Sequence, residues 1–418
     1  MSKNNENKLV PKLRFSEFKS NGEWKENLLN EVSTAIFDGT HQTPTYTENG
    51  IPFFSVENII SGNKNKFISR ADYLLATSKN KPEKGDIIIT RIGNIGTSKV
   101  IDWDYEFSVY VTLAIVKKSS SFDSHYLHCY FQSSRYQKEI LSKSLLNAVP
   151  CKINMDELRR TKILLPPDKE KKEQKKIAAC LTSLEEIIRA ENQKRKILQN
   201  HKKGLLQNLL AQEGESVPNF RFKKFKDAGV WKETTLTQIA DYENGKAHEQ
   251  DIADYGEFIV VNSKFISQDG EVKKFTNTAF CPTTKGDVLM VLSDIPNGRA
   301  IAKCFLVEED NRYTVNQRIC RITPRNLNSK ILYYLLNRNP YFLAFDDGVK
   351  QTNLRKEDVL NCPLMIPSNP QEQEMIAGTL SSVDDLINAQ TLKLEALQLH
   401  KKGLLQGLFP NLNEEKHE

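Results

Sequence analysis

The sequence lacks the features that mark membrane and secreted proteins. Its longest apolar stretches, such as Ile87 to Ile89, Phe258 to Val261 and Leu364 to Ile366, are far shorter than the roughly 20 residues that cross a bilayer. The N-terminal residues MSKNNENK carry positive charge with no apolar segment behind them, so we expect no secretory signal. These absences predict a cytoplasmic chain without a membrane segment.

Cysteine pairs are also missing. The seven cysteines are scattered along the chain and nowhere form a CxxC motif. An odd number at such spacing argues against a disulfide framework and against a structural zinc site. We therefore expect free thiols in a reducing compartment and no metal held by this chain.

The motifs of common catalytic sites are absent as well. There is no GxxxxGK[ST] loop, because GNIGTSK at Gly93 has the wrong glycine spacing for ATP hydrolysis. HExxH, GxSxG, an Asn/Asp-Pro-Pro-aromatic run and a glycine-rich turn for S-adenosylmethionine are missing too. The sequence predicts no catalytic residue and no bound cofactor.

Size and composition indicate a multidomain chain with a charged surface. The protein has 418 residues, 39% hydrophobic and 27% charged, which favours two or three domains over one core. Lys and Arg total 59 against 53 Asp and Glu, a formal net charge of +6. This balance permits nucleic-acid binding without demonstrating it.

The most informative feature is an internal repeat. PKLRFSEFK at Pro11 returns as PNFRFKKFK at Pro218, and Trp24-Lys25-Glu26 returns at Trp231, both 207 residues later. Lys84-Gly85-Asp86 before an apolar run pairs with Lys285-Gly286-Asp287, and HKKGLLQ recurs unchanged at His201 and His400. Because the offset shrinks in steps, the two halves differ mainly in loop length.

Each half has the same order of expected elements. Strand-forming segments come first, namely IPFFSV, GDIIITR, TSKVIDW and VTLAIV in the first half and EFIVVN, GDVLMVL, RAIAKCFLV and QRICRIT in the second. A helix is then expected over SHYLHCYFQSSRYQKEILSKSL and over SKILYYLLNRNPYFLAF. A short apolar segment ending in proline, KILLPP or CPLMIP, closes each half.

A long helix should follow each closing segment, about 40 residues or ~60 Å of helix. Apolar residues recur at heptad a/d positions in both, interrupted at Glu191, Arg195 and Lys202 in the first and at Gln390 and Lys401 in the second. A stripe of that length is too long to be covered by a small domain, so we expect the two helices to pair. The residues expected at this interface are Ile177, Leu181, Leu184, Ile188, Leu198, Leu205, Ile376, Leu380, Val383, Ile387, Leu397 and Leu404.

The expected fold is therefore α+β, with two β-rich domains in tandem repeat, each followed by a long helix, and the helices paired as an antiparallel coiled coil. The expected boundaries are a first domain over 1–168, a first helix over 169–212, a second domain over 213–368, a second helix over 369–410 and a tail over 411–418.

These elements, in this order, resemble the specificity subunit of a Type I restriction-modification enzyme over nearly the whole chain. The matching segments are the PKLRFSEF and EWKE opening, DGTHQTP, GIPFFSVENI, KGDIIITRIGNIG, LPPDKEKKEQKKIAACLTSLEEII and HKKGLLQ, and in the second half GDVLMVLSDIPNGRA, VNQRI and IPSNPQEQEMIAGTLSSVDDLI. The second helix begins from a shorter segment, Asn369 to Gln373, which leaves its first residue open.

The resemblance implies a non-catalytic DNA reader with two target-recognition domains, each reading one half of a split target while the helices set the unread spacer. The implied partners are double-stranded DNA, two modification subunits that bind S-adenosylmethionine and methylate adenine, and restriction subunits that use ATP and magnesium. On this interpretation the chain itself binds no cofactor.

Reading base edges requires polar and basic side chains projected from loops. In the first half the candidates after glycine turns are His41, Gln42, Thr43, Arg91, Asn94, Thr97 and Lys99, and in the second His248, Ser293, Asn297, Arg299, Gln317 and Arg318. Two segments before the closing strands add Lys152 and Asn154, and Lys350, Gln351 and Asn353, as candidates for holding phosphates.

Other interpretations stay open at this point. Any single candidate fits a solvated loop residue, and Gly93-Asn94 and Asn297-Gly298 suit a hairpin turn without a ligand. A coiled-coil scaffold with no DNA role would account for the heptads. A nuclease at Asp168 and Glu170 is a third hypothesis, although acidic residues in the first turn of a helix are explained by the helix dipole alone.

Overall fold

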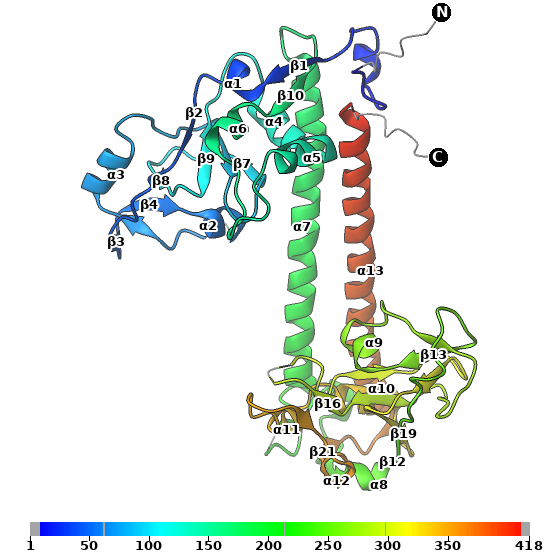
Figure 1. Cartoon of the computed structure of the whole chain (residues 1–418). Helices are drawn as coiled ribbons and strands as arrows, with labels where there is room; N and C mark the ends of the chain where they lie inside the picture. The colour runs from blue at the N-terminus through cyan, green and yellow to red at the C-terminus, as the bar shows by residue number, and fades with distance from the viewer. Residues whose placement is uncertain (1–8, 62, 213, 297, 411–418) are drawn as a thin grey trace, which may run out of the picture. The chain divides into compact units, whose positions relative to one another are not determined.

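The computed structural model describes residues 9–61, 63–212, 214–296 and 298–410, which form two compact units (Figure 1). Unit 1 comprises the chain up to Asn192 together with the segment from Leu392, and unit 2 comprises Gln193–Thr391. The long helices α7 (Lys172–Leu209) and α13 (Pro370–Leu408) each belong partly to one unit and partly to the other. Each unit thus combines one globular part with a segment of both long helices.

Unit 1 is built on a four-stranded antiparallel sheet with strand order β2-β9-β6-β7. A second sheet has the order β3-β5-β4-β8, in which β4 and β8 run parallel, and β1 pairs with β10. The strands are β1 (Lys25–Leu28), β2 (Ile36–Asp38), β3 (Tyr46–Thr47), β4 (Ile51–Phe54), β5 (Phe67–Ile68), β6 (Ile87–Thr90), β7 (Ser98–Val100), β8 (Ser108–Val109), β9 (Leu113–Val116) and β10 (Lys162–Leu165). The shorter helices are η1 (Ser16–Phe18), α1 (Leu29–Val32), α2 (Val56–Ser61), α3 (Arg70–Ala76), α4 (Ser124–Phe131), α5 (Ser134–Ser142) and α6 (Met155–Arg159).

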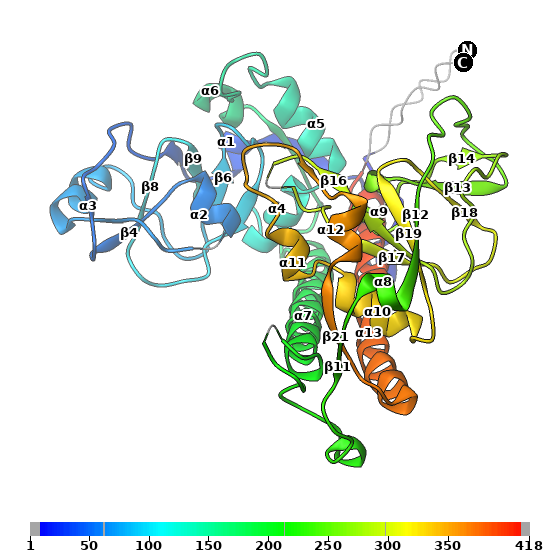
Figure 2. The ribbon, with the colours of Figure 1, turned by 90° about the horizontal axis from the view of Figure 1, so that it is seen from below.

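Unit 2 repeats this plan, with a sheet of order β12-β19-β15-β17 (Figure 2). Beside it β14, β13 and β18 form a three-stranded sheet in which β13 and β18 run parallel. The strands are β11 (Lys232–Thr235), β12 (Ala240–Asn244), β13 (Phe258–Val261), β14 (Phe275–Thr276), β15 (Val288–Val291), β16 (Ser293–Asp294), β17 (Cys304–Leu306), β18 (Tyr313–Val315), β19 (Ile319–Pro324), β20 (Thr352–Asn353) and β21 (Pro363–Ile366). The shorter helices are η2 (Lys223–Phe225), α8 (Leu236–Ile239), α9 (Ser263–Ser267), α10 (Ser329–Leu336), α11 (Pro340–Leu343) and α12 (Lys356–Leu360).

The central strand of each sheet is buried on both faces. In unit 1 Ile87 and Ile89 pack into the core that contains α4, while Ile88 faces a second core beside β4 and β8. Successive side chains of a strand point to opposite faces, so an unbroken apolar run requires a core on each side. Val288 and Leu289 divide between two cores in unit 2 in the same way.

The helix expected after the strands is broken in both units. In unit 1 it divides into α4 and α5, because Ser133 is an N-cap whose hydroxyl accepts from the Tyr136 N–H. In unit 2 Asn339 caps α11, with Pro340 in its first turn. The prediction of one continuous helix was wrong in each half, since the apolar period continues across a residue that starts a new helix.

The long helices pair antiparallel within each unit. In unit 1 Lys401 lies 2.6 Å from the Glu185 carboxylate, and Lys393 pairs with Glu191, so residue numbers fall on α13 as they rise on α7. In unit 2 Lys202 lies 2.5 Å from Asp384. The predicted fold class, two β-rich repeats with an antiparallel helix pair, is confirmed.

Burial along both helices follows the expected a/d positions. The side chains of Ile177, Leu181, Leu184, Leu209, Ile376, Leu380, Val383 and Leu408 are buried, and Ile188, Leu198, Leu205, Ile387, Leu397 and Leu404 are half-buried. Neighbours such as Glu186 and Asp385 are exposed. The part that each a/d residue plays in pairing stays a prediction.

A buried ion pair fixes the start of each long helix to the opening motif of its own unit. Arg14 donates twice to Glu173, with Nε–Oε1 and Nη2–Oε2 both 2.8 Å, and Arg221 donates to Glu372 at 2.7 and 2.8 Å. The next residue repeats as well, since Gln174 accepts from the Asp123 N–H and Gln373 from the Asn328 N–H. These contacts explain why the RF and EQ motifs occur twice.

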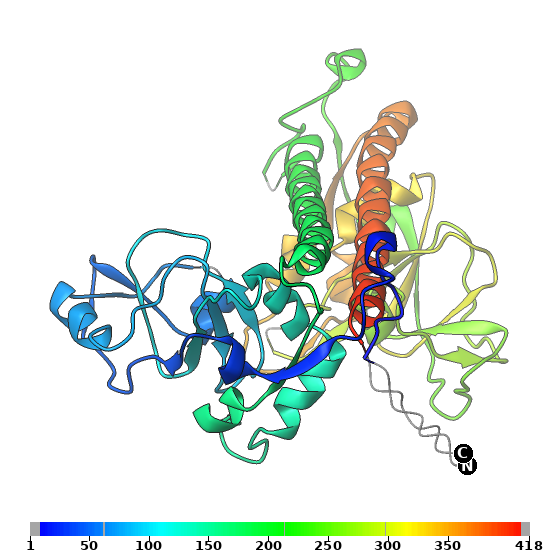
Figure 3. The same cartoon turned by 90° about the horizontal axis from the view of Figure 1, so that it is seen from above.

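The last turns of α13 complete the core of unit 1. Leu408 and Phe409 are buried, and the Phe409 ring packs 6.2 Å from Trp24 and 5.8 Å from Tyr126. The Leu13 N–H also donates to the Gly407 carbonyl at 2.8 Å, which places the opening segment beside the end of α13 (Figure 3). In unit 2 Leu209 and Leu210 at the end of α7 join the core with Trp231.

Candidate nucleic-acid interface

The loop after β2 presents the first group of candidates. Gly39 lets this loop approach the backbone of β8, because a Cβ there would lie 2.0 Å from the Val109 carbonyl oxygen. Gly245 makes the same approach after β12, with 2.1 Å to the Asn316 carbonyl oxygen. In unit 1 the His41 side chain, two residues after Gly39, is 73% exposed, and its Nε2 lies 3.0 Å from Asp38 Oδ2. Gln42 and Thr43 are also exposed, so this loop offers donors and acceptors to solvent.

Arg91 lies inside unit 1, below this loop. Its guanidinium donates to Asp38 at 3.0 Å and to the Val111 carbonyl at 2.8 Å, and the residue is 7% exposed. Burial lowers the pKa of Arg91, and the Asp38 carboxylate opposes that shift, so the group stays charged at neutral pH. Arg91 therefore supports the His41 loop through Asp38.

Asp38 was not among the predicted site residues, although it joins Arg91 to His41 through a single carboxylate oxygen. The sequence does place an acidic residue at the end of a strand, immediately before a glycine. That signal suits an ordinary turn equally well. Only the tertiary contact distinguishes the two interpretations.

The β6–β7 hairpin presents a second group. Asn94 is exposed at its tip, and its carbonyl accepts from the Thr90 hydroxyl. Thr97 is half-buried, with its N–H donating to Thr90 Oγ1 at 2.9 Å. Lys99 is directed along the strand to the Trp103 ring, 5.4 Å from its centroid. Of these three, Asn94 is the most open to a ligand.

The segment before β10 lies beside this hairpin. Lys152 forms bridges with Ile92 and Leu145, and the Ile153 N–H donates to the Arg91 carbonyl at 2.9 Å. The Lys152 and Asn154 side chains are exposed. Unit 2 has the same arrangement, where β20 pairs with β16, Asn353 is exposed on β20, and exposed Lys350 and Gln351 come just before it.

His248 is not on the surface of unit 2. It is 0% exposed, its Nδ1 lies 2.6 Å from the Lys246 carbonyl oxygen and its Nε2 lies 2.9 Å from Thr314 Oγ1. The ring also packs against Phe280 at 5.1 Å. Since both ring nitrogens have partners within the protein, His248 holds its loop to β18.

Asp294 organises the loop that contains several unit 2 candidates. Its carboxylate accepts from the Ala300 and Ile301 N–H groups at 2.6 and 3.1 Å. Arg299 is exposed on this loop, whereas Ser293 is 9% exposed and accepts from Gln351 Nε2 at 2.7 Å. Asn297 lies outside the described residues. Sequence reasoning missed Asp294 because its role depends on the return of the chain at Ala300.

Gln317 and Arg318 occupy the turn between β18 and β19, and both side chains are exposed. Gln317 donates to Glu249 at 2.8 Å, which connects this turn to the loop after β12. In unit 1 the corresponding positions lie between β8 and β9, where the Arg91 N–H donates to the Thr112 carbonyl. Unit 2 therefore exposes a guanidinium at a turn where unit 1 has Thr112.

Asp168, part of the nuclease hypothesis, acts as a cap of α7. Its two carboxylate oxygens accept from the Glu170 and Glu173 N–H groups, both at 3.0 Å. Partial burial raises the pKa of Asp168, but these backbone donors outweigh it and hold the pKa below its usual value. This geometry is that of a helix N-terminus.

Two general findings apply to the described part of the chain. None of its helices is both long and apolar enough to cross a membrane. Across residues 9–61, 63–212, 214–296 and 298–410, no group of three or more His, Cys, Asp or Glu side chains is arranged to hold a metal ion.

Two stretches of the chain, residues 21–200 and 229–398, match the family described as the Type I restriction modification DNA specificity domain. Among named relatives, the Type I restriction enzyme MjaVIII specificity subunit of Methanocaldococcus jannaschii is 23% identical over 390 residues, covering 86% of this chain and 85% of that protein. The putative MjaX specificity subunit of the same organism is 21% identical over 416 residues, 93% of each protein.

Solved structures have a similar fold. The S subunit of a Type I restriction-modification system from M. genitalium superposes with a TM-score of 0.63 at 15% identity, covering 97% of this chain and 100% of that one. A chain from a structure of type I R-M complex assembly and conformational transition gives a TM-score of 0.54 at 15% identity, covering 93% and 98%. At this identity the likeness concerns the fold alone.

Proposed function

This chain belongs to the family of Type I restriction-modification DNA specificity subunits, and we propose that it reads a split DNA target, one half-site with each unit. Members of this family are the non-catalytic DNA-recognition subunits of their enzymes. The finer proposal concerns how this chain recognises DNA and where its partners bind.

The observation that carries the proposal is the contrast between the two repeats. Each unit keeps the same central sheet and the same ion pair at the start of its long helix, yet the loops that leave the sheet differ in length, sequence and internal contacts. A pair of readers for two different half-sites requires one shared frame and two different surfaces. A scaffold without a DNA role has no such requirement.

We assign base contacts to exposed donors and acceptors on these loops. In unit 1 they are His41, Gln42, Thr43 and Asn94, and in unit 2 Arg299, Gln317 and Arg318. Phosphate contacts are assigned to Lys152, Asn154, Lys350, Gln351 and Asn353, since a phosphate requires charge and N–H donors rather than a base-specific pattern. Arg91, Ser293 and His248 are buried, so their proposed role is to position these loops.

The proposed domain boundaries remain those of the sequence, with recognition domains over 1–168 and 213–368 and spacer helices over 169–212 and 369–410. On this proposal the paired helices act as a ruler that fixes the number of unread base pairs. One helical turn of DNA spans about 34 Å, a distance that helices of this length can bridge.

We further propose that two modification subunits dock on the long helices and that restriction subunits join through them. Exposed apolar side chains on both helices support this, because such surface is costly to leave in water. Ile187 is 47% exposed, and Leu386, at the corresponding position of the second repeat, is 55% exposed. Leu392 and Leu399, one heptad apart on α13, are 67% and 70% exposed. The complex would act on DNA in the cytoplasm.

The test is selection from a random duplex pool by this chain co-expressed with its modification subunit. The expected result is enrichment of two short motifs at one fixed separation, with binding that weakens steeply as salt rises. Enrichment of a single motif would mean that only one of the two units reads DNA. A well-formed complex that enriches no sequence would contradict the proposal and favour the scaffold.

A further inference from the structure

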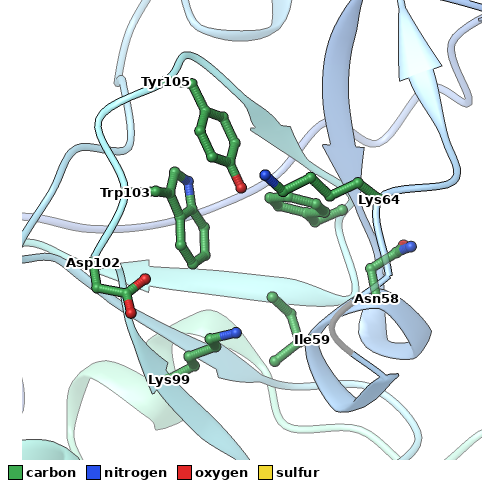
Figure 4. A pocket seen from close by; sticks show the side chains of 8 residues that line it. Asn58, Ile59, Lys64, Lys99, Asp102, Trp103 and Tyr105 are labelled. Carbon is green, nitrogen blue, oxygen red and sulfur yellow. The ribbon is translucent and has the colours of Figure 1, made fainter.

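A cavity of about 250 Å³ opens in unit 1, on the face of the central sheet that carries Lys99 (Figure 4). Its walls come from β4, β7 and the loop that follows β7, through Phe54, Lys99, Asp102, Trp103 and Tyr105, and Lys64 closes one side. The volume is below that of pockets for drug-sized ligands and suits a single planar ring system.

Aromatic rings form much of the wall. The Trp103 and Tyr105 rings stack with centroids 5.7 Å apart and planes 13° apart, and Phe54 meets Trp103 edge to face at 5.7 Å. Stacked rings with an open side are the surfaces on which proteins hold nucleobases.

Polar groups stand at both ends of these rings. The Trp103 indole Nε1 is buried and has no hydrogen-bond partner among the described residues. In Figure 4 the indole nitrogen, the Tyr105 hydroxyl and the Lys64 amino group gather at one end, with Lys99 and Asp102 at the other.

The lysines supply charge for an anion. Lys64 Nζ lies 3.9 Å from the Tyr105 ring centroid, and Lys99 Nζ lies 5.4 Å from that of Trp103. The two ammonium groups outweigh the single Asp102 carboxylate of the lining, so the cavity favours a ligand that is both planar and negatively charged.

Unit 2 fills the corresponding space with its own side chains. Phe305 pairs with Leu289 on the neighbouring strand, as Lys99 pairs with Ile88 in unit 1. The Phe305 ring packs 5.1 Å from the Phe265 ring and 5.3 Å from the Tyr313 ring. Val307 makes the same backbone hydrogen bonds as Ile101 of unit 1. Glu309, two residues later, therefore occupies the position that Trp103 has in unit 1. The cavity is therefore not a requirement of the fold.

We propose that this cavity binds a single nucleotide, with the base against Trp103 and Tyr105, the phosphate held by Lys64 at one end, and Lys99 and Asp102 facing the edge of the base at the other. The nucleotide has two possible sources with the same chemistry, a free nucleoside monophosphate or an unpaired nucleotide of bound DNA. Binding of the free nucleotide is independent of the split-site reading proposed above, while the DNA source rests on it.

The test uses the full chain and adenosine monophosphate, followed by Trp fluorescence and calorimetry, with ribose 5-phosphate as the probe without a base. Trp24 and Trp231 are each 2% exposed within cores, so quenching reports on Trp103. Lys99→Phe, which copies unit 2, should abolish binding, and Lys64→Met should weaken it about tenfold. Lys274→Met, at an exposed lysine of unit 2, is the matched control and should leave the affinity unchanged.

A second arm uses a duplex with one unpaired 2-aminopurine against the same duplex fully paired. Fluorescence quenching of the unpaired base that is lost in Lys99→Phe, without binding of the free nucleotide, would identify DNA as the source. Absence of binding in both arms, or equal binding by wild type and Lys99→Phe, would overturn the proposal. Sequence selection from a random pool is measured separately, so its failure would not be confused with failure here.

Discussion

The two units are most alike where a globular part meets its long helix and least alike where loops leave the central sheet. Arg14–Glu173 and Arg221–Glu372 have the same two-bond geometry, and Lys401–Glu185 and Lys202–Asp384 join the helices in both. The loops instead rely on unrelated contacts, an Arg91–Asp38–His41 chain in one unit and an Asp294 turn in the other. Constant contacts fix the frame, and variable contacts carry the differences that recognition requires.

The largest expected effect comes from breaking one of the buried ion pairs. Arg14→Ala should destabilise unit 1, and Arg221→Ala unit 2, by about 3–5 kcal/mol each, because either change leaves a buried carboxylate without its partner. Unit-resolved hydrogen exchange in urea measures this, with Lys12→Ala at an exposed lysine as the control. If either variant increased hydrogen exchange equally in both units, the two ion pairs would not stabilise their units independently.

Charge in the helix seam should have the next largest effect. Leu184→Lys and Val383→Lys, at equivalent positions 8% and 7% exposed, should each cost about 2–4 kcal/mol and reduce assembly with the modification subunit. Glu186→Lys and Asp385→Lys, at exposed positions two residues further on, are the matched controls. Assembly that survives both seam variants, measured by size-exclusion chromatography with light scattering, would show that the pairing model is wrong.

Loop substitutions should leave folding intact and change recognition in one half-site only. His41→Ala should relax the preference in the half-site read by unit 1, and Arg318→Ala that read by unit 2, by about 1–3 kcal/mol of discrimination. Selection from a random pool by each variant measures the effect. A change in both half-sites from one substitution would be incompatible with separate readers.

The smallest expected effect is a pH response that differs between the units. Burial lowers the pKa of His128, whose Nε2 lies 3.0 Å from Gln132 Nε2, and in turn Gln132 donates to Glu185 at 3.0 Å. Burial raises the pKa of Glu185, but its bond to Lys401 outweighs this and keeps that pKa low. Both groups therefore contribute to the stability of unit 1 at neutral pH. The contribution of His128 is lost as pH falls below about 6.5, and that of Glu185 is lost as pH falls below about 4.3.

Unit 2 has no histidine at this contact, because the Tyr334 hydroxyl donates to Asp384 at 2.7 Å. Unit 1 should consequently lose more stability than unit 2 between pH 7 and pH 5. Hydrogen exchange of the two units at both pH values tests this, and His128→Gln should remove the difference. An unchanged difference in His128→Gln would exclude His128 as its cause.

The fold could be predicted from the sequence because its signals are local. The repeat, the apolar strands and the a/d stripe each lie within one segment, whereas the break at Ser133 depends on a cap that the apolar period conceals. The same distinction holds at the candidate interface. Exposed loop residues such as Gln42 were identifiable by type and position, but the burial of Arg91 and His248 depends on residues far along the chain. The cavity beside Trp103 combines separated segments, so no motif marks it.

The most direct test of the spacer role is selection from a random pool with a chain lengthened by one heptad in each long helix, between Asn192 and Gln193 and between Thr391 and Leu392. Seven residues preserve the a/d register and add about 10.5 Å of helix. We expect the same two motifs as for the wild-type complex, separated by up to about three more base pairs. Unchanged separation with both motifs intact would contradict the claim that the paired helices set the spacer.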